Sequence, residues 1–151
     1  MAINKEQLKK TFLIAIGFTI VLGWLDFSTM NFWNLPITQD FGIFYWRFVT
    51  VAVILMASMV WVFKKDKSEA VAVGSIFYIL SVTGWEDFWF YLFSQQSIPA
   101  TMNHLFENGT FMGWLAKTMG LSTVTPTSLI ISMVVGIIVA YYVSQYLIKK
   151  L

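Results

Sequence analysis

Long runs of apolar residues, separated by short polar segments, dominate the chain. Four runs are long enough to cross about 30 Å of hydrocarbon as helices that rise about 1.5 Å per residue. They cover residues 11–33, 43–63, 70–93 and 127–148. This pattern predicts an all-α integral membrane protein, with a single four-helix transmembrane domain over residues 1–151.

The connection between the third and fourth runs, residues 94–126, is longer than a turn needs. Pro99 can begin a helix, and Gly109, Gly113 and Gly120 interrupt the segment that follows. Apolar side chains are mixed with polar ones along this segment, which is typical of helices lying in a membrane interface. We therefore expect one or two short interfacial helices here.

Composition agrees with this class of protein. Of the 151 residues, 58% are hydrophobic and 12% are charged, whereas soluble domains have about a quarter of their residues charged. The chain has no cysteine, which excludes disulfides, thiolate metal sites and a cysteine nucleophile. A net charge of +2 is too small to indicate nucleic-acid binding.

The distribution of basic residues predicts how the chain is oriented. Only Arg47 and Lys117 lie toward one side of the four runs. The other eight of the ten basic residues flank the opposite ends: Lys5, Lys9, Lys10, Lys64, Lys65, Lys67, Lys149 and Lys150. The positive-inside rule then predicts a multi-pass protein of the cell membrane with both termini in the cytoplasm. Residues 64–69 form the inner turn, with Ser68 as the expected helix cap.

Four ionisable residues lie inside the apolar runs: Asp26, Arg47, Glu86 and Asp87. Helix rise is about 1.5 Å per residue. Asp26 therefore lies about 21 Å from Phe12, at the inner end of its run, and Glu86 lies about 24 Å from Ala70, at the inner end of its run. Arg47 lies about 6 Å below the outer surface. All four are therefore expected in the outer third of the membrane. Three carboxylates face one arginine, so at least one carboxylate lacks a cationic partner within the runs.

Charges in hydrocarbon are rare, and three interpretations of these four stay open. Arg47 can form a structural pair with Asp26 or Glu86 near the water boundary. The group can instead line a catalytic or ligand-binding site, in which Glu86, Asp87 and Asp26 are the candidate catalytic residues. The third interpretation is a proton or ion pathway.

Aromatic residues gather on the outer side. Six of the seven tryptophans belong to the outer half: Trp24, Trp33, Trp46, Trp85, Trp89 and Trp114. An interfacial belt combined with helix packing explains this distribution. An aromatic-walled ligand site explains it as well, and the candidate ligand-binding residues are then Arg47, Trp24, Tyr45, Trp85 and Trp89.

A divalent metal is a further candidate ligand. His104 is the only histidine, and His104 and Glu107 are spaced to lie on one helix face. Together with Glu86 they offer nitrogen and oxygen ligands of the kind that hard or borderline metals accept. The alternative is a surface histidine on an amphipathic helix.

Small residues recur every four positions in the fourth run: Ser132, Gly136, Ala140 and Ser144. A shorter row in the first run consists of Ala15, Thr19 and Gly23. Small residues at this spacing allow helices to approach closely in lipid. The rows predict either a seam between the first and fourth helices or a docking face for a second copy or another membrane subunit.

Together these patterns predict a small polytopic membrane protein with a polar, aromatic-lined site in the outer third of the bilayer. That site would bind or act on an apolar ligand or a metal. The alternatives are a non-catalytic accessory subunit of a larger membrane complex and a small transporter. Whether the protein is an enzyme stays open.

Overall fold

The computed structural model describes residues 5–33, 39–95, 97–107 and 110–150 of the chain. All regular elements in this part are helices, as expected. They are α1 (Lys5–Trp33), α2 (Gln39–Lys64), α3 (Lys67–Val82), α4 (Trp85–Ser94), α5 (Asn103–Glu107), α6 (Phe111–Thr118) and α7 (Pro126–Lys150). A single bridge between Met102 and Val124 closes the connection between α4 and α7, in which α5 and α6 are the two short helices.

Two of the described helices are long and apolar enough to cross a membrane, namely Glu6–Ser28 within α1 and Pro126–Lys149 within α7. Helices α3 and α4 reach the necessary length only together, and they are bent by 65° where they meet. The described apolar part of α2, Phe48–Lys64, is shorter than a full span. A helical membrane protein is therefore supported, while four spans and the sides of the termini stay predictions.

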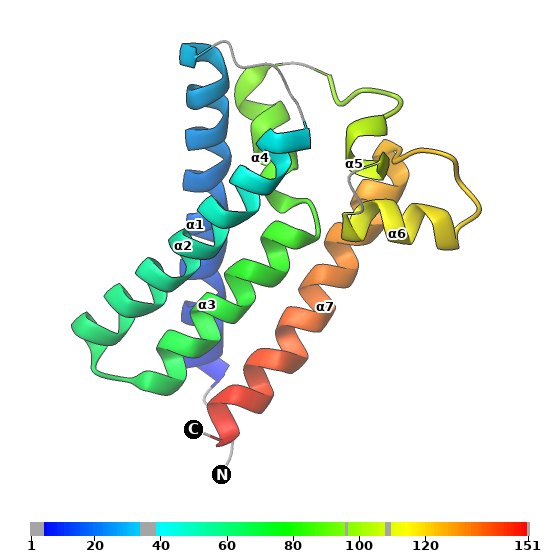
Figure 1. Cartoon of the computed structure of the whole chain (residues 1–151). Helices are drawn as coiled ribbons and strands as arrows, with labels where there is room; N and C mark the ends of the chain where they lie inside the picture. The colour runs from blue at the N-terminus through cyan, green and yellow to red at the C-terminus, as the bar shows by residue number, and fades with distance from the viewer. Residues whose placement is uncertain (1–4, 34–38, 96, 108–109, 151) are drawn as a thin grey trace.

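Helix α3 occupies the centre of the molecule, with α1, α2 and α7 packed around it (Figure 1). Beyond the bend, α4 leans against α1, and α5 and α6 lie beside the beginning of α7. The start of α1, the α2–α3 turn and the end of α7 share one end of the molecule. The arrangement is not the regular four-helix bundle that the apolar runs suggested, because the third run is broken.

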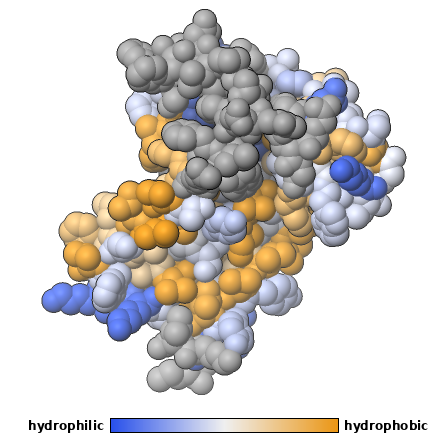
Figure 2. Space-filling view, in the orientation of Figure 1, coloured by the Kyte–Doolittle hydropathy of each residue, from blue (hydrophilic) through white to orange (hydrophobic). Residues whose placement is uncertain are grey.

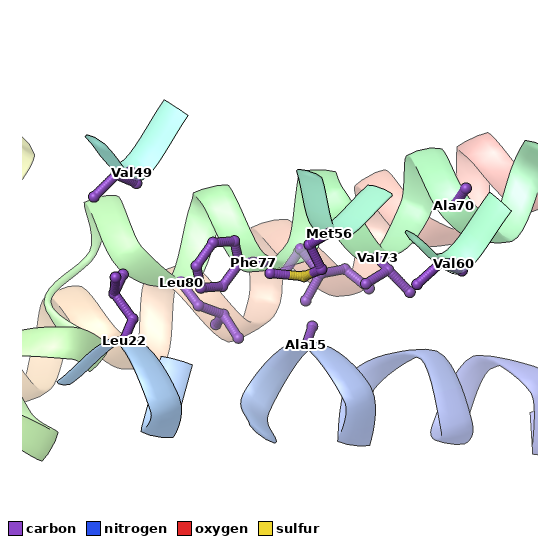
Figure 3. Close-up of a cluster of buried hydrophobic side chains, with 11 residues drawn as sticks. Ala15, Leu22, Val49, Met56, Val60, Ala70, Val73, Phe77 and Leu80 are labelled. Atoms are coloured by element: carbon purple, nitrogen blue, oxygen red, sulfur yellow. The ribbon is translucent and has the colours of Figure 1, made fainter. Parts of the chain in front are cut away.

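The main core forms around α3 (Figure 3). Val73, Phe77 and Leu80 are buried there against Ala15 and Leu22 of α1 and against Met56 and Val60 of α2. The faces of α1, α2 and α7 that point away from this core are apolar and exposed (Figure 2). Phe63 of α2, for example, is 80% exposed. Apolar faces of this extent suit contact with lipid rather than with water.

The break between α3 and α4 consists of Thr83 and Gly84. The Thr83 hydroxyl turns back and donates to the carbonyl oxygens of Ile79 (2.9 Å) and Leu80 (3.1 Å). Gly84 has a φ of 94°, a left-handed conformation that favours glycine. A side chain on Gly84 would also collide with Leu129 of α7, so both the backbone and the packing require glycine here.

The small residues of α7 form the seam with α3. Ser132, Gly136, Ala140 and Ser144 are all buried, and a Cβ on Gly136 would lie 2.8 Å from Thr83 Cβ. The expected seam with the first helix is therefore wrong, because α7 packs on the break and on α3. Within the chain, α3 lies against this row. Partner binding itself stays a prediction.

The α2–α3 turn is capped by Asp66 rather than by Ser68. An Asp66 carboxylate oxygen accepts from the Glu69 backbone N–H (3.1 Å) and from the Ser68 hydroxyl (2.6 Å), and the other accepts from Gln7 Nε2 (3.4 Å). The hydrogen bond from the Ser68 hydroxyl, followed by that from the Glu69 N–H, lowers the pKa of Asp66 below its usual 3.8. Ser68 thus supports the cap from inside the first turn.

Replacing Gly136 with alanine should destabilise the fold by about 1–3 kcal/mol, because the new methyl group has no space beside Thr83. Gly17→Ala is the matched control, since a Cβ on Gly17 meets nothing within 4 Å. That change should be neutral or stabilise by about 0.4–1 kcal/mol. Unfolding of the purified protein by SDS measures both effects, and equal effects would contradict the proposed seam.

Removing the cap with Asp66→Ala should lower the free energy of unfolding by about 1 kcal/mol at pH 7. Asp66→Asn keeps an oxygen acceptor and should lose less. The folded pKa of Asp66 is lowered, so the contribution of its charge is complete above the usual value and is lost as the pH falls below it. The stability difference between wild type and Asp66→Asn should therefore shrink between pH 5 and pH 3 (about one unit either side of that value). A difference that stays constant over this range would contradict the charged cap.

Candidate functional site

The structure brings together the three carboxylic acids of the apolar runs. The side chain of Asp26, from α1, is hydrogen-bonded to the side chain of Glu86, from α4. Asp87 lies close enough to Asp26 for their charges to interact. An ionised carboxylate can only accept hydrogen bonds, so a bond between two carboxyl groups requires a proton on one of them. We call these three residues the carboxyl cluster.

The bend at Gly84 positions the acids of α4 beside Asp26. It directs α4 toward α1, and Gly23 allows the two helices to approach closely. A Cβ on Gly23 would lie 2.5 Å from Trp89 Cβ and 3.1 Å from the Glu86 carbonyl oxygen. Trp89 Nε1 donates to the Thr19 hydroxyl at 3.2 Å on the same interface. Asp26 and Glu86 therefore meet along a closely packed helix pair.

Burial and local electrostatics differ among the three acids. Glu86 is only 4% exposed, whereas Asp26 and Asp87 are partly exposed. Glu86 and Asp87 occupy the first turn of α4. The positive end of the helix dipole and the unpaired N–H groups of a first turn favour negative charge there. The break thus stabilises acids that a continuous helix would not.

The tryptophans next to the cluster hold helices together. Trp85 Nε1 donates to the carbonyl oxygen of Met133 in α7 at 3.2 Å, and Trp89 Nε1 binds Thr19. Trp24 is 52% exposed. The side chains of Arg47 and Tyr45 lie outside the described part of the chain. A ligand-binding role for these residues stays a prediction, with packing roles now assigned to Trp85 and Trp89.

The expected metal site has no support. The described residues contain no group of three or more His, Cys, Asp or Glu placed to hold a metal ion. His104 and Glu107 of α5 have side chains outside the described part. Glu86, the third expected ligand, instead pairs with Asp26.

The segment between α4 and α7 contacts the site from the other side of the break. Met112 of α6 is buried, and a Cβ on Gly84 would lie 2.6 Å from its sulfur. Met112 belongs to a second buried cluster with Leu129, against which Trp85 also packs. Helix α6 is itself capped by Thr110, whose hydroxyl accepts from the Gly113 N–H at 3.0 Å. Helix α6 therefore packs directly against the break through Met112.

The residues that position the site, Thr83, Gly84 and Met112, were not among the candidates from the sequence. A signal was present, because Gly84 lies inside an apolar run, two residues before the acids Glu86 and Asp87. Glycine followed by acidic residues is typical of a helix that ends and restarts.

Comparisons of the chain with protein-family models, curated proteins and solved structures found no match. Function is therefore argued from the chemistry of the site.

A double-mutant cycle tests whether Asp26 and Glu86 act as a pair. Asp26→Asn and Glu86→Gln should be non-additive in the free energy of unfolding by more than about 0.5 kcal/mol, as expected for residues in direct contact. The control combines Asp26→Asn with Asp66→Asn, and this distant pair should be additive within about 0.5 kcal/mol. SDS unfolding measures both cycles, and additivity in the first would show that the two carboxyl groups do not interact.

Proposed function

We propose that this chain is a small integral membrane protein that binds positive charge at the carboxyl cluster. The bound species is a proton or the cationic group of a lipid-soluble ligand. The observation that carries the proposal is the hydrogen bond between the side chains of Asp26 and Glu86, with Asp87 within range of charge interaction. Acids gathered in poorly solvated surroundings repel one another unless a proton or cation neutralises part of their charge. Ionisable groups inside apolar helices are usually functional for this reason.

The proposed topology has four spans, with α1, α2 and α7 as three of them and the bent pair α3–α4 as the other. Eight of the ten basic residues flank one end, which favours both termini in the cytoplasm of a cell-membrane protein. The carboxyl cluster then lies in the outer third of the membrane, and residues 94–126 lie outside.

In this arrangement Glu86 and Asp87 are the candidate proton-exchanging groups, and Asp26 holds the shared proton in place. A carboxyl group in poor solvent can donate or accept a proton near neutral pH, which is the requirement for acid–base work. The same site could therefore act on an apolar ligand that enters from lipid. The accessory-subunit alternative has less support, because α3 covers the small-residue row that would dock a partner.

The 65° break between α3 and α4 favours one second candidate, a small transporter. Many transporters place their substrate and ion sites where a spanning helix is interrupted at depth in the membrane. The cluster lies in the first turn after such an interruption. Binding of positive charge is common to both candidates, so it is the property to test first.

The binding test uses tetraphenylphosphonium, a lipid-soluble cation, titrated into the detergent-purified protein by calorimetry. Wild type should bind it, and binding should weaken at acidic pH because protons compete for the same carboxyl groups. Glu86→Gln and Asp26→Asn should each weaken binding about tenfold, a change of about 1.4 kcal/mol. Glu6→Gln is the matched control on α1, since Glu6 is exposed and pairs with Lys10 instead.

Absence of binding to wild type, or equal binding by Glu86→Gln, would contradict the proposed function. The SDS-unfolding midpoint of each variant separates a lost site from a lost fold. Glu6→Gln should match wild type in both measurements.

The absence of native cysteine allows a clean test of topology. Lys117→Cys on α6 should react with a membrane-impermeant maleimide on intact cells. Lys65→Cys on the inner turn should react only after permeabilisation, because the basic end is expected inside. The reverse labelling pattern would overturn the orientation.

A further inference from the structure

The α2–α3 turn has two acids, and both are engaged within the protein. Asp66 accepts hydrogen bonds from Ser68, the Glu69 N–H and Gln7. Glu69 is buried and forms an ion pair with Lys64. Lys64 neutralises Glu69, whereas Asp66 keeps its negative charge because its hydrogen-bond donors are neutral groups. The turn holds Lys64, Lys65 and Lys67 against these two acids, so its net charge is positive.

Lys65 and Lys67 of this turn are exposed and form no ion pair with an acid among the described residues. The same holds for Lys9 near the start of α1 and for Lys149 at the end of α7. Lys9 is two residues from Gln7, about 200° around the helix, so it does not share the face on which Gln7 meets Asp66. We therefore call Lys65 and Lys67 the inner basic patch.

The patch adjoins an exposed aromatic surface at the end of α2. Lys67 Nζ lies 5.7 Å from the centre of the Trp61 ring, and Trp61 and Phe63 are both exposed. Lys65 stands just beyond them in a left-handed conformation, with a φ of 55°. Figure 2 shows hydrophilic residues at this turn directly beside the apolar surface of the neighbouring helices. Cationic groups next to exposed rings at a helix end match the boundary between lipid headgroups and acyl chains.

We propose that the inner basic patch binds the headgroup phosphate of an anionic phospholipid, with the acyl chains lying along Trp61 and Phe63. The inference rests on the membrane topology of the proposed function, and it is independent of the carboxyl cluster. Charge complementarity selects the partner, because a lysine near an anionic membrane surface contributes about fivefold in affinity. A zwitterionic lipid offers no such net attraction.

The experiment presents the purified full-length protein in detergent with equal amounts of phosphatidylglycerol and phosphatidylcholine and counts retained lipids by native mass spectrometry. Wild type should retain phosphatidylglycerol preferentially. The double variant Lys65→Gln/Lys67→Gln should reduce that preference at least fivefold. Lys65→Arg/Lys67→Arg, which keeps the charge, should retain most of it.

Lys117→Gln is the matched control, since Lys117 is an exposed lysine on α6 and lies over the Phe106 ring rather than at this turn. Equal retention of the two lipids by wild type would overturn the proposal. So would equal losses in Lys65→Gln/Lys67→Gln and Lys117→Gln, or displacement of the lipid by an acidic peptide at equal concentration.

If the inner basic patch does not bind the headgroup, tetraphenylphosphonium binding should be unaffected. If the carboxyl cluster does not bind positive charge, retention of phosphatidylglycerol should be unaffected. If cysteine labelling shows Lys65 outside the cell, the topology fails and the headgroup site falls with it. The SDS-unfolding midpoint of the glutamine variant should equal that of the arginine variant, so that a lost preference reports the charge alone.

Discussion

The contact between the helix break and α7 is the feature on which the rest of the structure depends. Gly84 adopts a left-handed backbone conformation, and Thr83 fits against Gly136 where no larger residue has space. Trp85 then binds the backbone of α7 through its indole N–H. The apolar run after Lys67 is divided here into two helices that meet at a 65° bend, where the sequence had predicted one helix. The bend instead turns α4 onto α1 and places two acids in a helix first turn.

The carboxyl cluster follows from that bend. Gly23 and Thr19 give α1 a narrow face on which α4 packs closely. Asp26, one turn further along, then meets Glu86. A hydrogen bond between two carboxyl groups requires a proton on one of them, and the proposed function depends on this proton. Two features of the fold stabilise this arrangement. Glu86 lies in the first turn of α4, and α4 packs closely on α1 at Gly23.

Local patterns predicted part of this structure. The lengths and hydropathy of α1 and α7 follow from their own residues, and counting helix rise placed Asp26 and Glu86 at one depth. Depth alone cannot say which acid faces which, because that depends on the rotation of α4 after the bend. The bend was missed because Thr83 and Gly84 sit inside a continuous apolar run, and their conformation is stabilised by Leu129 and Gly136 from distant sequence. The seam expected between the first and fourth runs was wrong for the same reason, because the spacing of small residues predicts close packing but does not say which helix packs there.

The central claim is that Asp26 and Glu86 share a proton inside the protein. Infrared spectroscopy of the reconstituted protein at pH 7 tests it directly, because a protonated carboxyl group has a carbonyl stretch that an ionised carboxylate lacks. Wild type and Asp66→Asn should show a protonated-carboxyl band. Asp26→Asn and Glu86→Gln should each remove or shift that band. A wild-type spectrum with no protonated carboxyl group at pH 7 would contradict the central claim.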